Sequence, residues 1–185
     1  MWFKIRITVI LLMGTLLVGA AMSYDLADEY AKYNQPISNK EVLQIYYNIV
    51  KATGQPEIYP PLTIDPSGTM NAYTTSKGIT IFRGLIDQVH GNKDMIALVL
   101  AHEAAHFALG HVGRETAPTT EETRIMELQA DHYGAYTMMH AGYNICEGRK
   151  LFLVFIKIDG DAMGLDHPDN AYRYEQLNTG CSEVI

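Results

Sequence analysis

The chain has 185 residues, of which 48% are hydrophobic and 19% charged, so it is long enough for one domain with a sizeable core. These fractions are ordinary for a globular protein. A formal net charge of −7 at pH 7, with no visible basic patch, argues against nucleic acid as the main partner.

The N-terminal segment differs in kind from the rest of the chain. Lys4 and Arg6 precede a run from Ile7 to Met22 that contains no charged residue. A basic segment before such an apolar run, which ends in small residues, is typical of a cleaved signal peptide. The run is shorter than the ~20 residues of a membrane span, but an uncleaved anchor is the alternative. We therefore predict a signal peptide or N-terminal anchor at residues 1–23 and a single domain at residues 24–185.

This N-terminal segment also predicts where the protein resides. Either form of it exports the rest of the chain, because the positive flank stays inside. The expected location is periplasmic or otherwise extracytoplasmic, with the domain free or anchored to the inner membrane through its N-terminal segment.

Apolar periodicity predicts helix and strand in the first half of the domain. Residues 40–53 carry a helical stripe that Gly54 ends. The prolines that follow, as far as Pro66, exclude helix and indicate irregular, edge-type strands. Two strands joined by a tight turn, and then a short helix, are expected at 69–73, 79–82 and 84–90.

Three further helices are expected in the second half. Their predicted N-terminal caps are Asn92, Thr119 and Asn144. The first of these helices is apolar nearly all round, which predicts burial, and Gly110 ends it. The other two begin with capping-box spacing, at Glu122 and Glu147. The fold class is therefore α+β, mostly helical, with a small hairpin or sheet beside the buried helix.

Cys146 and Cys181 are the only cysteines. In an oxidising compartment they could form one disulfide between the last predicted helix and the C-terminal tail. Two free thiols are the alternative, because spacing alone does not decide pairing.

The buried helix contains the pattern His102-Glu103-Ala104-Ala105-His106. Residues four apart on a helix point nearly the same way, so the two histidines can bind one zinc ion. Glu103 lies beside them, where it can take a proton from zinc-bound water. Such a pattern also arises by chance in a buried helix, so the site needs a third ligand.

Glu127 is the best candidate for this third ligand. His111 would lie on the opposite face if the helix continued, and the longer HExxHxxGxxH pattern fails because this chain has Leu109 and Val112. Glu127 lies among apolar neighbours in the next helix, where an unpaired carboxylate is costly to bury. Asp131, one turn further on, can accept the second ring proton of a ligating histidine.

Two other features bear on this site. Small residues on the two helices permit the close approach that short zinc–ligand distances demand: Ala101, Ala104, Ala105, Ala108, Ala130 and Gly134. Three histidines are interpreted as surface or core residues: His90, His132 and His140. An exposed acidic helix face is the alternative interpretation of Glu127 and Asp131.

Together these motifs resemble the HtpX-like, BepA-like and CAAX-prenyl-protease-like gluzincins, which are membrane-associated zinc endopeptidases. The resemblance spans residues 40–178 and rests on four stretches: His102–His106, Glu127–Asp131, Asn71-Ala72-Tyr73, and His167-Pro168 with Arg173. It implies a zincin-type metallopeptidase domain that holds one zinc ion through His102, His106 and Glu127. It also implies a protein or peptide substrate.

The resemblance further implies catalytic roles. Glu103 is the expected general base, and Asp131 orients a ligating histidine. His167 or Arg173 would stabilise the oxyanion, with Tyr136 as a weaker candidate. His167 could instead approach the metal and inhibit, and both roles remain open. The strand with Asn71, Ala72 and Tyr73 would be the edge to which an extended substrate adds, or else an ordinary supporting hairpin.

The predicted function is therefore a zinc endopeptidase acting on exported or envelope proteins. One alternative is a catalytically latent zinc-containing scaffold or chaperone module at the envelope, although an intact Glu103 argues against it. Another is a metal-free structural protein. The sequence predicts neither the natural substrate nor the oligomeric state.

Overall fold

A computed structural model describes residues 36–159, 167–178 and 180–181. The predicted signal peptide or anchor at residues 1–23 lies outside this part of the chain. None of the helices described is both long and apolar enough to cross a membrane.

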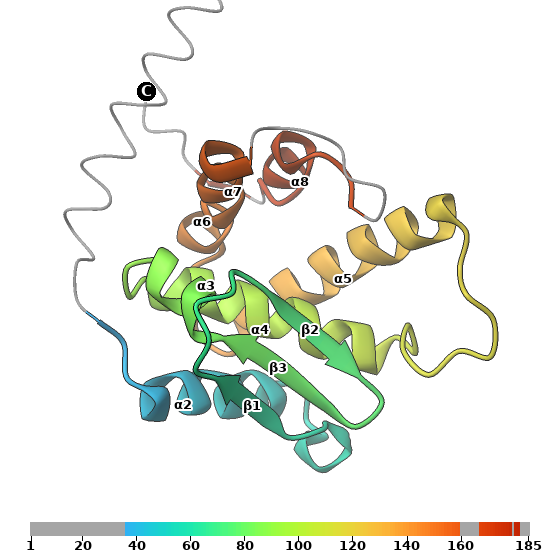
Figure 1. Cartoon of the computed structure of the whole chain (residues 1–185), viewed down its shortest axis with the longest axis horizontal. Coiled ribbons are helices and arrows are strands. Elements are labelled where there is room, and N and C mark those ends of the chain that lie inside the picture. The colour runs from blue at the N-terminus through green and yellow to red at the C-terminus, as the bar shows by residue number, and fades with distance from the viewer. Residues whose placement is uncertain (1–35, 160–166, 179, 182–185) are drawn as a thin grey trace, which may run out of the picture. The chain divides into compact units, whose positions relative to one another are not determined.

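The described chain is mostly helical, with one small sheet (Figure 1). Its elements in order are α2 (Asn39–Ala52), the 3-10 helix η1 (Pro56–Ile58), β1 (Leu62–Asp65), β2 (Ala72–Thr75), β3 (Gly78–Phe82), α3 (Arg83–Gln88), α4 (Lys93–Ala108), α5 (Thr120–His140), α6 (Ile145–Gly148), α7 (Leu151–Asp159) and α8 (Asn170–Gln176). This arrangement confirms the predicted α+β class.

The three strands are ordered β1-β3-β2. β2 and β3 form the predicted antiparallel hairpin, and β1 adds parallel to the other side of β3. The central position of β3 follows from its apolar pattern, because Ile79 and Ile81 are fully buried. β2 therefore lies at an edge of the sheet.

The first strand of the hairpin begins later than the predicted start at residue 69. Ala72 pairs with Ile81, and the Phe82 N–H donates to the Asn71 carbonyl at 3.0 Å. The residues before Asn71 would have to pair with Arg83 and beyond, where the chain is already helical. They therefore have no strand beside them, and β2 cannot extend toward its N-terminus.

α4 is the centre of the fold. It contacts β2 and β3 and also α2, α5 and α6, so it is surrounded, and Figure 1 shows it behind the sheet. Every residue from Met95 to Ala105 is buried, as the all-round apolar pattern predicts. Asn92 is its N-cap, with its side chain accepting from the backbone N–H groups of Asp94 and Met95.

α5 crosses α4 at close range. It begins at the predicted capping box of Thr119 and Glu122 and ends before Gly142. At Gly134 an added Cβ would lie 2.8 Å from the backbone nitrogen of His102. Glycine at this point lets the backbones approach closely enough for side chains on both helices to meet.

The last predicted helix is in fact two, α6 and α7. Asn144 caps α6 as expected, but Glu147 does not close a capping box and pairs instead with Lys150 at 3.2 Å. The chain turns at Arg149, whose buried side chain donates to the Tyr174 carbonyl at 3.2 Å. Phe152, which follows this break, is buried, and the Arg173 guanidinium of α8 lies over its ring.

A disulfide joins Cys146 of α6 to Cys181 beyond α8, across a separation of 35 residues. The sequence left this pairing open. It ties the C-terminal segment to the body of the fold.

Candidate metal centre

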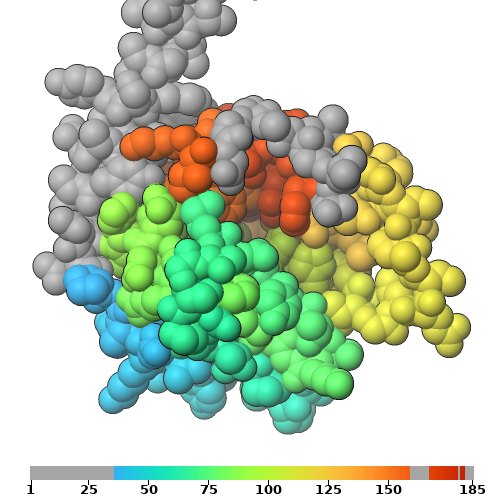
Figure 2. Space-filling model, in the orientation of Figure 1, coloured from blue at the N-terminus to red at the C-terminus, as the bar shows by residue number. Residues whose placement is uncertain are grey.

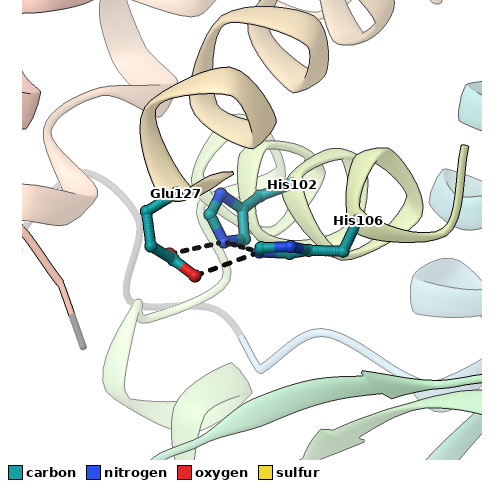
Figure 3. Close-up of side chains that lie close together, drawn as sticks. All are labelled: His102, His106 and Glu127. Atoms are coloured by element: carbon teal, nitrogen blue, oxygen red, sulfur yellow. Dashed lines mark hydrogen bonds and ion pairs between the residues drawn. The ribbon is translucent and has the colours of Figure 1, made fainter. Parts of the chain in front are cut away.

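Two neighbouring helices bring three metal-ligating side chains together (Figure 3). His102 and His106 project from the same side of α4, and Glu127 reaches them from α5. The Nε2 atoms of the two histidines are 3.0 Å apart. Each lies 3.3 Å from an oxygen of the Glu127 carboxylate.

This geometry fits zinc. Ligand atoms placed tetrahedrally at 2.0–2.2 Å from the ion are about 3.4 Å from one another, close to the three separations here. Two imidazole nitrogens and one carboxylate are a donor set that zinc prefers, and they leave a fourth position for a reactant. Within the described residues, His102, His106 and Glu127 are the cluster of side chains whose ligand atoms lie close enough together to hold a metal ion.

His102 is oriented by a buried ion pair. Its Nδ1 lies 2.9 Å from Oδ1 of Asp131, and Arg173 donates two hydrogen bonds of 2.7 Å to the same carboxylate. Burial would raise the pKa of Asp131, but the Arg173 charge and its hydrogen bonds outweigh this and lower the pKa to about 2. The ionised Asp131 accepts from Nδ1, which leaves Nε2 facing the metal position.

The cluster favours a cation at its centre. Burial would raise the pKa of Glu127, yet hydrogen bonds with His102, His106 and His167 hold it well below the ordinary carboxyl range. Burial would lower the pKa of His102, but hydrogen bonds to Asp131 and Glu127 raise it to about 10. Two buried carboxylates therefore stay ionised and attract positive charge.

Glu103 is held by a residue that sequence reasoning missed. The Thr74 hydroxyl, on β2, lies 2.7 Å from Oε2 of Glu103 and 2.8 Å from its backbone oxygen. Strand alternation puts Thr74 on the face that looks toward α4, while Tyr73 points outward and is 44% exposed. The alternation was readable in the sequence, but the position of α4 behind the strand was not.

Residues 36–120 match the sequence model of peptidase family M48. Over these residues, which are fewer than half of the chain, the protein is similar to that family. The family implies a metallopeptidase hydrolase, but the match does not resolve a subfamily among the HtpX-like, BepA-like and CAAX-prenyl-protease-like members. Searches of curated proteins and of solved structures gave no match.

The M48 match contains the His102–His106 helix and ends before Glu127. The contribution of α5 to the site therefore rests on this chain's own geometry. Asp131 and Glu127 lie one turn apart on α5, so the ligand and the residue that orients His102 come from one helix face.

The C-terminal segment returns to the site through His167 and Arg173. Nδ1 of His167 lies 2.7 Å from Oε2 of Glu127, and the His167 side chain is 55% exposed. Arg173 approaches the same oxygen at 3.8 Å, but its guanidinium is buried against Asp131. Tyr136, the weaker candidate for the oxyanion, packs on His140 with ring centroids 4.0 Å apart and is 59% exposed.

His111 contacts His106, a candidate metal ligand, instead of lying on the opposite face. α4 ends at Ala108, and the chain reverses at Gly110, so the ring of His111 returns to His106 with Nδ1 atoms 3.1 Å apart. The sequence prediction assumed that the helix continued. His90, His132 and His140 lie outside the ligand group.

A cavity of about 350 Å³ opens beside His102 and Glu103. Figure 2 shows this face hollowed between the green segments of the sheet and the orange and red segments of the C-terminal helices. Its walls are mostly apolar, formed by Met70, Ala72, Leu85, Leu98, Val99, Leu151, Phe152 and Phe155. Its lining also includes Glu103, Asp131 and Arg173, of which the last two pair with one another.

Proposed function

We propose that this chain is a zinc-dependent endopeptidase that cleaves exported or envelope proteins. One observation carries the proposal: His102, His106 and Glu127 converge from two helices, with Glu103 beside them at the mouth of a cavity. A structural zinc site would be closed by a fourth protein ligand, whereas this donor set leaves a position for a reactant.

The chemistry divides between the metal and Glu103. Zinc held by the three ligands supplies a Lewis acid that lowers the pKa of water and polarises a carbonyl. Glu103 takes the proton from the attacking water and passes it to the leaving amine. The Thr74 hydroxyl fixes the carboxylate of Glu103, and Asp131 fixes the ring of His102.

The edge of β2 is the proposed place for the substrate backbone. Among the described residues, β2 pairs with β3 on one side and with no strand on the other. The segment Asn71–Tyr73 borders the cavity through Asn71 and Ala72. An extended peptide can add to such an edge through main-chain hydrogen bonds, which suits a protein substrate of varied sequence. The apolar cavity would take an uncharged side chain next to the bond that is cut.

His167 is the proposed partner of the charge that develops on the carbonyl oxygen. It is exposed and lies beside Glu127, whereas the Arg173 guanidinium is committed to Asp131. Arg173 therefore acts through Asp131, as a positioning residue for His102.

Export is part of the proposal. The basic, then apolar N-terminal segment is typical of a signal peptide or anchor. The Cys146–Cys181 disulfide supports the same location, because structural disulfides persist in oxidising compartments.

Substituting the base tests the activity. Glu103→Gln should abolish hydrolysis of casein by the full chain, because an amide cannot take a proton, and the variant should still bind zinc. Glu127→Ala should lose both, since it removes a ligand. Hydrolysis at the wild-type rate by Glu103→Gln would refute the assignment.

A latent zinc-containing scaffold is the second candidate, and the 2.7 Å contact between His167 and Glu127 favours it. A tail held on a metal ligand could block the reactant position. The two candidates predict opposite results for His167→Ala: the endopeptidase loses casein hydrolysis, whereas the latent protein gains it.

A further inference from the structure

We propose that His111 and Gln129 hold the metal ligand His106 in the orientation and tautomer that zinc requires. The inference rests on the proposed zinc site but concerns residues to which that proposal gives no role. His111 and Gln129 touch neither the metal position nor the cavity beside it, so they are positioning residues.

The C-terminal end of α4 brings His111 to this place. Gly110 has φ +68°, a conformation that residues with a side chain rarely adopt, and the chain reverses there. The His111 N–H then donates to the His106 carbonyl at 2.9 Å. With its backbone fixed, the His111 ring lies edge-on to the His106 ring, their centroids 5.1 Å apart.

The proton positions along this chain of contacts follow from the metal site. Nε2 of His106 faces Glu127 and must carry no proton when it binds zinc, so the proton is on Nδ1. That Nδ1–H can donate to Nδ1 of His111, 3.1 Å away. The His111 proton is then on Nε2, which donates to Oε1 of Gln129 at 3.2 Å. Every donor in this assignment meets an acceptor.

The two zinc histidines are thus held by different chemistry. His102 donates to an anion, Asp131, which is buried and paired with Arg173. His106 donates to the neutral, half-buried ring of His111, which in turn donates to the exposed amide of Gln129. The neutral partner orients His106 without adding negative charge, so it does not weaken the Lewis acidity of the bound ion.

α5 contributes to both arrangements. Glu127 ligates and Gln129, two residues further on, ends the hydrogen-bond chain from His106. The packing of α5 on α4 therefore fixes the position of Glu127 and also the orientation of His106. Loss of either His111 or Gln129 should release the His106 ring to rotate, and the ion should leave faster.

The test measures zinc release from the full chain into excess chelator. His111→Phe, which removes the acceptor but keeps a ring, should release zinc roughly 10- to 100-fold faster. His111→Asn places an oxygen near the former Nδ1 and should restore most of the difference. Gln129→Met should give a smaller acceleration, and Gln129→Glu, which keeps the acceptor, should resemble wild type.

His132→Phe is the matched control, because His132 is an exposed histidine on α5 outside the ligand group. It should release zinc at the wild-type rate. A second readout is the visible absorption of the cobalt-substituted protein, which should change in His111→Phe and not in His132→Phe, because it reports the ligand geometry.

Wild-type release rates in both His111→Phe and Gln129→Met would overturn the inference and leave the endopeptidase proposal intact. If His111→Phe does not fold, Gln129→Met and Gln129→Glu still decide the result, because Gln129 is exposed. A wild-type chain that binds no zinc would overturn the proposed function and this inference with it.

Discussion

The Thr74 hydroxyl is placed to orient Glu103, the carboxylate that we propose as the general base. The Thr74 side chain is 2.7 Å from Oε2 of Glu103 and comes from the strand proposed to bind substrate. A general base whose side chain is already ordered before substrate binds loses no conformational entropy in the transition state, and this lowers the activation free energy. The strand would then align the peptide and the base together.

Thr74→Val should therefore reduce kcat/KM with little effect on zinc binding. Valine keeps the shape and removes the hydroxyl, at a cost of roughly 1–2 kcal/mol in the transition state, or about 5- to 30-fold in rate. Thr74→Ser should recover most of the activity. The measurement is peptide hydrolysis at a matched zinc content, and an inactive Thr74→Ser variant would indicate a packing role for the threonine instead.

His102 leads to a prediction about protons. Its pKa is raised from 6.5 to about 10 by hydrogen bonds to Asp131 and Glu127, so below pH 10 the zinc-free ring is protonated. Zinc must displace the proton on Nε2. Binding should therefore release a proton at pH 8, where an ordinary histidine has already lost its own.

Calorimetry of zinc binding in buffers with different ionisation enthalpies measures this release. Asp131→Asn is the comparison, because an amide does not stabilise the imidazolium and should reduce the number of protons released at pH 8. Equal observed enthalpies in all buffers for the wild type at pH 8 would contradict the prediction.

The sequence could predict those side chains whose placement depends on the pattern of a single helix, and not those whose contacts depend on how distant elements pack. His102, Glu103 and His106 follow from helical spacing, and Glu127 and Asp131 from burying acids among apolar neighbours. Thr74 and His111 do not follow, because their contacts depend on where β2 lies and on the reversal at Gly110. Sequence periodicity carries no information on either.

At the scale of elements, the contact between α4 and α5 makes the site. Gly134 lies where α5 crosses α4, and its Cα faces backbone atoms of Ala101 and His102. The same crossing brings Glu127 of α5 within 3.3 Å of the histidines of α4. Helix separation and ligand geometry are therefore coupled.

Gly134→Ala should weaken both folding and zinc binding. The new Cβ would lie 2.8 Å from the His102 nitrogen, so α5 must move away or tilt, and Glu127 moves with it. Overpacking of this kind typically costs 1–3 kcal/mol, an order-of-magnitude range that denaturant unfolding can measure. Zinc affinity should fall in parallel.

Tyr136→Ala provides the control on the same helix, because the Tyr136 side chain is exposed. It should change neither quantity much. Unaltered zinc affinity in Gly134→Ala would mean that the ligand geometry tolerates a wider helix spacing than the site suggests.

The elements themselves were largely predictable, since caps and apolar periodicity are local. The predicted starts at Asn92 and Thr119 are confirmed, whereas the strand before Ala72 and the continuous helix after Asn144 were wrong. The first error has a non-local cause, because the end of β3 limits β2. The second falls at Arg149, where the backbone keeps helical angles and the side chain donates to the Tyr174 carbonyl.

At the scale of the whole molecule, the C-terminal segment completes a site that the middle of the chain begins. Arg173 of α8 neutralises Asp131 and stacks over the buried ring of Phe152, its guanidinium carbon 4.5 Å from the ring centroid. The disulfide from Cys146 to Cys181 closes the loop that contains α7, His167 and α8. The family resemblance implied that His167 and Arg173 would lie at the site, whereas local sequence patterns carry no information on where the tail packs.

This closed loop predicts the effect of reduction. Opening a loop of 35 residues should lower the free energy of unfolding by about 3–4 kcal/mol, because the unfolded chain regains the entropy that the bond removed. Cys146→Ser and Cys181→Ser should each show this loss in denaturant unfolding, as should the reduced wild type. The double variant should be no worse, because all of these forms lack the same bond.

Zinc release should accelerate as well, since α8 would hold Arg173 on Asp131 less firmly. Equal unfolding midpoints for oxidised and reduced protein would show that the ion pair and the packing of Phe152 hold the tail without help from the disulfide.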